Sequence, residues 1–244
     1  MISAVILAGG IGSRLRSVVP DLPKPMAPIS GRPFLEYQLD YWISQGISSF
    51  VLSVGYRHEA IVDYFGNGYK GAELDYVIEK IPLGTGGGLL LAVEKVGNNV
   101  PFLLLNGDTY FAVDLKDLAE FARENDADWC FSLFRTNEEE GRYMGMEVSP
   151  SGQIISLKSG TGHRARLANG GVYWVHSRAL LGGKFSPGEK VSLEDDILPA
   201  AMGSGQRLFG IEFPGTFIDI GVPDDYRRAP ALLANRKEGQ IGSN

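Results

Sequence analysis

The chain has 244 residues, and 44% of them are hydrophobic, which is enough for a sizeable core in one large domain. Its formal net charge is -6, from 23 basic and 29 acidic residues, and this balance argues against a general nucleic-acid or membrane surface, because such surfaces need a basic patch. The sequence shows neither a signal-peptide pattern nor an apolar stretch long enough to cross a bilayer, so we expect a cytoplasmic protein.

The first predicted strand leads directly into a glycine-rich turn. Ala4–Leu7 is short, apolar and rich in branched side chains, as buried parallel strands are, and three glycines follow within positions 9–12. A backbone without Cβ atoms can turn tightly and bring its N–H groups against phosphate oxygens. Arg14 adds donors that match phosphate geometry, and Lys24, between two prolines, adds a compact charge. The segment predicts a nucleoside triphosphate cradle; the alternative is a simple structural turn, since the spacing matches neither common glycine fingerprint.

Strands and helices then alternate through the first half of the chain. We predict helices over 34–46, 57–65 and 85–96, and strands over 50–54, 74–78 and 101–106. This alternation predicts right-handed βαβ units and a mainly parallel sheet with helices on both faces. Ligands of such sheets bind outside the carboxyl ends of the strands. The glycine-rich turn, the loop 82–88 and Gly107 with Asp108 all follow strands, so they should share one edge.

The second half is predicted to be richer in short strands. Cys130 lies in the apolar run 129–134, which favours a buried structural role and, as the single cysteine, excludes an intrachain disulfide. Ser192 is a candidate N-cap for a following helix, and a last helix is expected near Pro223. Three short strands separated by turn residues are expected over Tyr143–Val148, Ile154–Lys158 and Gly171–Val175. They predict an antiparallel or mixed extension that holds the variable substrate.

Two aspartates are candidates for a metal site. Asp108 and Asp219 each follow an apolar run and have a glycine within two positions, which places a carboxylate at a strand end. Magnesium usually takes one or two carboxylates together with substrate phosphates and waters. The alternative, and the commoner role of aspartate beside glycine, is that each side chain only forms a turn.

These motifs together carry a family resemblance. The string Gly-Gly-x-Gly-Ser-Arg-Leu at 9–15, the Lys-Pro-Met at 24–26 and the contexts of Asp108 and Asp219 resemble those of the sugar-1-phosphate nucleotidyltransferases, over nearly the whole chain. The resemblance implies a Rossmann-like α/β fold, a metal site at both aspartates and Mg²⁺ as the cofactor. It also implies one domain over 1–236, with a nucleotide-binding half over about 1–110, a sugar-phosphate half over about 111–236 and a polar tail over 237–244.

Glu79 is the candidate reader of the base. The resembling family places a polar residue next to the base a few positions before a Pro-x-Gly loop, and Glu79 stands so before Pro82–Gly84. A carboxylate can accept two parallel hydrogen bonds from guanine, whereas uracil and thymine offer one imide donor and adenine no such pair. GTP is therefore favoured, and the alternative is a solvent-exposed pair of Glu79 and Lys80.

The resemblance implies GTP and a sugar 1-phosphate as partners, without nucleic acid or membrane, and leaves a homo-oligomer open. Both reactants are anionic, so charge neutralisation by Arg14, Lys24 and magnesium matters more than a general base, and these two side chains are the expected catalytic residues. Nucleotide binding is assigned to Leu7, Ala8, Gly9, Gly10, Gly12, Ser13, Glu79, Pro82, Gly84, Thr85, Asn106 and Gly107, and sugar-phosphate binding to Gly145, Lys158, Asn169, Tyr173 and Glu194.

The identity of the sugar is the most detailed prediction. Leu157-Lys158-Ser159 stands where the family often has Glu-Lys-Pro, so an acidic contact to the hydroxyls of ordinary hexoses is missing. Within the family the short chain, its Lys24–Ile29 segment and its Glu79–Gly87 segment favour a guanylyltransferase for a seven-carbon manno-sugar 1-phosphate. Mannose 1-phosphate is the alternative substrate, and a noncatalytic nucleotide-sugar sensor is the alternative from another functional class.

Overall fold

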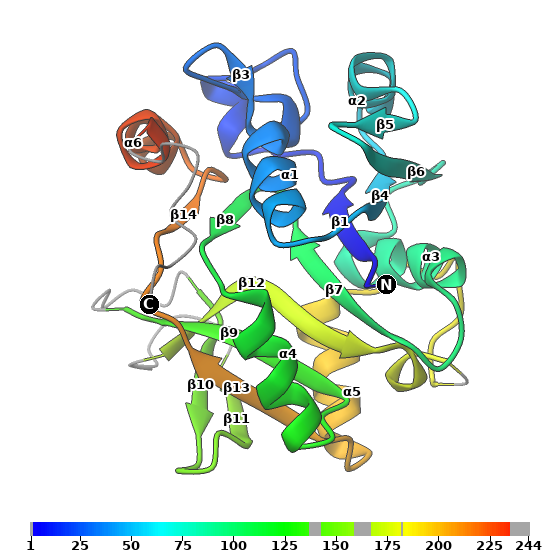
Figure 1. Ribbon diagram of the computed structural model, residues 1–244. Coiled ribbons are helices and arrows are strands. Elements are labelled where there is room, and N and C mark those ends of the chain that lie inside the picture. Colours follow the sequence, from blue (N-terminus) through cyan, green and yellow to red (C-terminus); the bar gives the residue numbers. More distant parts are fainter. Residues whose placement is uncertain (1, 137–142, 159–166, 182, 235–244) are drawn as a thin grey trace.

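The computed structural model describes residues 2–136, 143–158, 167–181 and 183–234, and most of their strands form one large sheet (Figure 1). The strands of this sheet are β1 (Ala4–Ala8), β4 (Ser49–Val54), β5 (Gly68–Tyr69), β6 (Ala72–Ile78), β7 (Pro101–Asn106), β9 (Trp129–Arg135), β10 (Gly145–Val148), β11 (Ile154–Lys158), β12 (Leu167–His176) and β13 (Leu208–Glu212). Its order is β11-β10-β12-β7-β1-β4-β6-β5, and β9 pairs with both β12 and β13.

Helices cover both faces of the sheet, as the sequence predicts. They are α1 (Phe34–Ser44), α2 (His58–Phe65), α3 (Gly84–Val96), α4 (Leu115–Glu124), α5 (Leu198–Gly203) and α6 (Pro223–Ala234), with a π-helical turn at Leu193–Ile197 before α5. Side chains alternate between the faces: Ile6 of β1 packs in the cluster that includes α1, α2 and α4, while Val5 packs with α3 and α5. No helix among the described residues is long and apolar enough to cross a membrane.

The sheet is parallel across β7, β1, β4 and β6 and mixed beyond these strands. β1 pairs in parallel with β4 and β7, and β4 pairs in parallel with β6. β12 then runs antiparallel to β7, and β10 runs antiparallel to both β11 and β12. The predicted antiparallel strands therefore continue the same sheet, and β12 is longer than predicted because it pairs along its length with three neighbours.

Two elements bring distant segments of the chain to the sheet edge. β8 (Thr109–Phe111) directly follows β7 and pairs antiparallel with β14 (Phe217–Asp219), so Asp219 lies opposite Thr109. The remaining short pair is β2 (Pro28–Ile29) with β3 (Arg32–Pro33). The prediction for Cys130 is confirmed: it is fully buried, and burial raises the pKa of its thiol.

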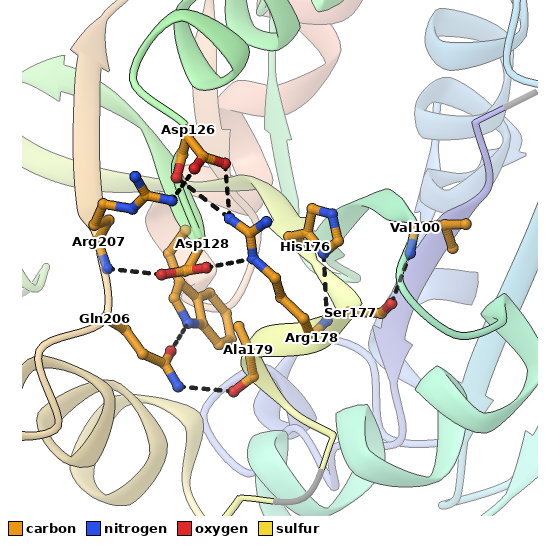
Figure 2. Close-up of polar contacts among 10 residues, drawn as sticks. Val100, Asp126, Asp128, His176, Ser177, Arg178, Ala179, Gln206 and Arg207 are labelled. Atoms are coloured by element: carbon orange, nitrogen blue, oxygen red, sulfur yellow. Dashed lines mark hydrogen bonds and ion pairs between the residues drawn. The ribbon is translucent and has the colours of Figure 1, made fainter.

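An ion-pair network joins three segments of the chain (Figure 2). They are the residues just before β9, just after β12 and just before β13. Asp128, just before β9, accepts hydrogen bonds from Arg178 Nε at 2.8 Å and from the backbone N–H of Arg207 at 2.9 Å. Asp126 pairs with the guanidinium groups of both arginines. The Asp128 side chain is only 14% exposed, whereas that of Asp126 is 62% exposed, so the two carboxylates should differ in their effect on stability.

We predict that Asp128→Ala lowers the free energy of unfolding by about 1–3 kcal/mol, because it leaves the backbone N–H of Arg207 and Nε of Arg178 without their acceptor. Asp126→Ala should cost less, since exposed ion pairs are screened by solvent. Urea denaturation of both variants measures the difference. Equal losses in the two variants would contradict this account of the network.

Candidate active site

A pocket of about 690 Å³ lies where β1 and β7 end. The glycine-rich turn, the loop that begins α3, and both candidate metal aspartates contribute to its wall. Eighteen of the residues predicted from the sequence line it: Leu7, Ala8, Gly9, Gly10, Gly12, Ser13, Arg14, Lys24, Glu79, Pro82, Gly84, Thr85, Asn106, Gly107, Asp108, Asn169, Glu194 and Asp219. Segments from the whole chain thus converge in one concave site, which agrees with a binding site for a ligand or ligands with several distinct chemical groups.

Close backbone approach fixes the floor of the pocket. The N–H of Gly107 donates to the carbonyl of Leu7 at 2.9 Å, and a Cβ on Gly107 would lie 2.5 Å from that oxygen. Gly12 adopts a φ of +69°, and a Cβ there would lie 2.8 Å from Cγ of Lys24. Glycine is needed at both positions, because any side chain would separate β1 from β7 or displace the Lys24 stem.

Lys24 and Asp108 form an ion pair across 84 positions of sequence. Lys24 Nζ lies 2.6 Å from Asp108 Oδ2, and the two side chains are 16% and 29% exposed. Asp219 Oδ1 accepts the N–H of Gly221 at 2.7 Å, so the turn-forming alternative holds for this side chain. Gly221 also lies among three charged groups: a Cβ on it would lie 2.7 Å from Asp219 Oδ1, 3.1 Å from Lys24 Nζ and 3.2 Å from Asp108 Oδ2.

Glu79 is held in the pocket wall by two donors. Its Oε2 accepts the N–H of Leu83 at 3.0 Å, and its Oε1 accepts the hydroxyl of Ser53 at 3.1 Å. The carboxylate also packs so closely on Gly9 that a Cβ there would overlap it. The alternative of an exposed pair with Lys80 is therefore wrong. Because two carboxylate oxygens together accept about four hydrogen bonds, Glu79 keeps acceptor capacity for a ligand.

The glycines of α3 admit a segment from the second half of the chain. The N–H groups of Gly86 and Gly87 donate to the carbonyl of Val191 at 2.9 and 3.0 Å, and a Cβ on Gly84 would lie 2.6 Å from that same oxygen. The hydroxyl of Thr85 donates to Glu194 Oε2 at 2.7 Å and accepts the N–H of Leu193 at 2.9 Å. The loop predicted to bind the nucleotide is thus bonded to the carboxylate predicted to bind the sugar.

Two predicted contacts need correction. Tyr173 is fully buried and does not line the pocket, because it points into the core with the apolar residues of β12 and alternation sends Val172 and Trp174 to the other face. Its hydroxyl accepts a bond from Asn169 at 2.7 Å, and burial raises its pKa. Gly145 is also buried, paired between Lys158 and Ala168. The side chain of Lys158 lies outside the described part of the structure.

Sequence reasoning missed several lining residues. Tyr143 and Met144 directly precede Gly145, and Phe217 stands two positions before Asp219 on the same strand face, so neighbouring motifs held a signal for these three. Lys190 carried no signal, since a lysine in a polar loop is ordinary. The full set of missed lining residues is Ile11, Pro25, Thr109, Tyr143, Met144, Gly171, Lys190 and Phe217.

Comparisons with known proteins agree with this geometry. The model of the nucleotidyl transferase family matches residues 3–236. The D-glycero-alpha-D-manno-heptose 1-phosphate guanylyltransferase of Aneurinibacillus thermoaerophilus is 43% identical over 94% of this chain and 97% of its own length. The Campylobacter jejuni protein of the same name is 38% identical over 91% and 96%. The crystal structure of HddC from Yersinia pseudotuberculosis superposes with a TM-score of 0.81 and 33% identity, covering 95% of this chain and 99% of that one, and HddC has also been solved complexed with GMP-PN.

We predict that Gly87→Ala destabilises the protein by about 1–3 kcal/mol, although alanine favours helix more than glycine does. The added Cβ would overlap the carbonyl oxygen of Glu189 and lie 2.6 Å from Cβ of Leu83. Thermal unfolding and hydrogen exchange of residues 189–193 measure the effect. Gly203→Ala in α5 is the control, because its Cβ would meet nothing within 4 Å; equal stability of the two variants would contradict the steric account.

Proposed function

The chain belongs to the nucleotidyl transferase family, and we propose that it transfers GMP from GTP to D-glycero-α-D-manno-heptose 1-phosphate, giving GDP-heptose and pyrophosphate. Two relatives that match nearly end to end carry this activity in their names. The observation that carries the proposal is the single pocket in which the glycine-rich turn, the Lys24–Asp108 pair and the half-buried carboxylate of Glu79 meet.

The chemistry follows from charge. An oxygen of the sugar 1-phosphate attacks the α-phosphorus of GTP in line, the bond between this phosphorus and its bridging oxygen breaks, and pyrophosphate leaves with the bonding electrons. The attacking phosphate is already ionised at neutral pH, so positioning and charge neutralisation dominate. Arg14, Lys24 and Lys190 are the lining cations. Arg14 and Lys190 make no side-chain ion pair with the described residues, and both are therefore available to phosphate oxygens.

The donor set at Asp108 and Asp219 fits magnesium. Their carboxylate oxygens converge beside Gly221, and the described residues contain no group of three or more histidine, cysteine or acidic side chains that could hold a metal by itself. Two carboxylates are what Mg²⁺ takes when substrate phosphates complete its shell. Bound there, the ion would neutralise charge that develops on the phosphoryl oxygens. The backbone bond from Ile220 to the carbonyl of Asp108, at 2.9 Å, keeps the two carboxylates together.

We propose Glu79 as the reader of guanine, and we predict that Glu79→Gln relaxes the preference for GTP over UTP. One acceptor oxygen becomes a donor group, so one guanine donor meets a poor partner, at a cost of about 1–3 kcal/mol in discrimination. The ratio of kcat/KM values for the two nucleotides measures this. Glu73→Gln, an exposed position on β6, is the matched control, and undiminished selectivity in Glu79→Gln would remove Glu79 as the reader.

The identity of the sugar is tested by measuring turnover of a panel of sugar 1-phosphates with GTP, with pyrophosphate release as the readout. We predict a higher kcat/KM for D-glycero-α-D-manno-heptose 1-phosphate than for α-D-mannose 1-phosphate, by about tenfold to a few hundredfold, because one added CH–OH unit supplies limited differential binding. Equal or better turnover of mannose 1-phosphate would contradict the heptose assignment. Binding without any pyrophosphate release would favour a sensor and contradict the enzyme.

A further inference from the structure

A buried glutamine outside the pocket holds the turn that carries Asp108. Gln38 lies on the core-facing side of α1 and is only 2% exposed. Its Nε2 donates to the carbonyl oxygen of Asn106 at 2.8 Å and also to the carbonyl oxygen of Thr109. These two carbonyls bracket Asp108 on either side, so one amide group spans the turn between β7 and β8.

The two bonds require an amide nitrogen at this place. Both use Nε2, while Oε1 of Gln38 is buried without a hydrogen-bond partner in the described part of the chain. A buried polar atom without a partner costs free energy, and the two bonds to the turn offset that cost. A carboxylate of the same shape would face two carbonyl oxygens, and an apolar side chain would leave both carbonyls without this donor.

The backbone of the turn also makes hydrogen bonds of its own. The N–H of Gly107 donates to Leu7, and the carbonyl of Asp108 accepts the N–H of Ile220, both at 2.9 Å. Gln38 is a side chain from a helix, about 70 positions away in sequence, that acts on both ends of the same four residues. Lys24 then engages the carboxylate itself at 2.6 Å. Removing Gln38 would therefore free the backbone on each side of Asp108 while leaving its partners in place.

We propose that Gln38 is a positioning residue that sets the direction of the Asp108 carboxylate for a divalent cation. The inference rests on the proposed metal role of Asp108. Side chains that orient a metal ligand through hydrogen bonds typically contribute 10–100-fold to metal affinity. Gln38 reaches the metal ligand through its backbone, so we expect the lower end of that range.

The test measures Mn²⁺ binding to the nucleotide-free protein, with the free ion quantified by electron paramagnetic resonance. Gln38→Met keeps the length of the side chain and removes the donor, and it should raise the Kd for Mn²⁺ by about tenfold. Gln45→Met is the matched control: Gln45, the C-cap residue that follows α1, donates to the carbonyl of Val113 at 3.1 Å and accepts the N–H of Leu115 at 2.7 Å. It should lower the melting temperature without changing the Kd.

Asp108→Asn separates the two levels of the proposal. If wild type binds Mn²⁺, Asp108→Asn loses it and Gln38→Met binds within twofold of wild type, the positioning role is wrong while the metal site stands. If wild type binds no Mn²⁺, or if Asp108→Asn binds it as wild type does, the metal role of Asp108 fails in the free protein, and the positioning role fails with it. Should Gln38→Met not fold, Gln38→Asn retains an amide that is too short to reach both carbonyls, and it is held to the same tenfold expectation.

Discussion

The ion pair between Lys24 and Asp108 is the interaction on which the pocket depends. It joins the Pro-Lys-Pro segment to the end of β7, and the surrounding backbone is shaped to admit it: Gly12 leaves room for the Lys24 stem, and Gly107 lets β7 approach β1. The pair is partly shielded from water, so its attraction is stronger than that of a surface pair, while its main effect is to fix direction. Two charges of opposite sign thus stand beside Asp219, where anionic substrates and a cation would have to meet.

A second constraint joins the two halves of the chain. The carbonyl of Val191 accepts the N–H groups of Gly86 and Gly87, which lie in the first turn of α3 and lack partners within the helix. The hydroxyl of Thr85 donates to Glu194. The glycines of α3 therefore serve close packing against this segment, in addition to shaping the nucleotide loop. Because the carboxylate proposed for the sugar is bonded to the loop proposed for the nucleotide, the two substrates would be placed relative to each other by direct contacts.

Local sequence patterns predicted the parts that local physics decides. Apolar runs marked β1 and β7, and glycines close to Asp108 and Asp219 marked strand ends that do meet. The helix α4 was missed although Asp114 caps it by accepting the N–H groups of Lys116 and Asp117, a readable signal. The burial of Tyr173 and the reach of Gln38 depend on which face of a strand or helix meets which partner across some 70 residues of sequence, and no local pattern contains that.

The central claim is that Asp108 and Asp219 hold one divalent cation against the phosphates of GTP. The most direct measurement is anomalous diffraction from a crystal of this protein grown with Mn²⁺ and a nonhydrolysable GTP analogue. The account predicts one anomalous peak bonded to an oxygen of each carboxylate and to a phosphate oxygen, with guanine beside Glu79. A peak bonded to phosphates alone, with the 2.6 Å contact between Lys24 and Asp108 unchanged, would contradict it.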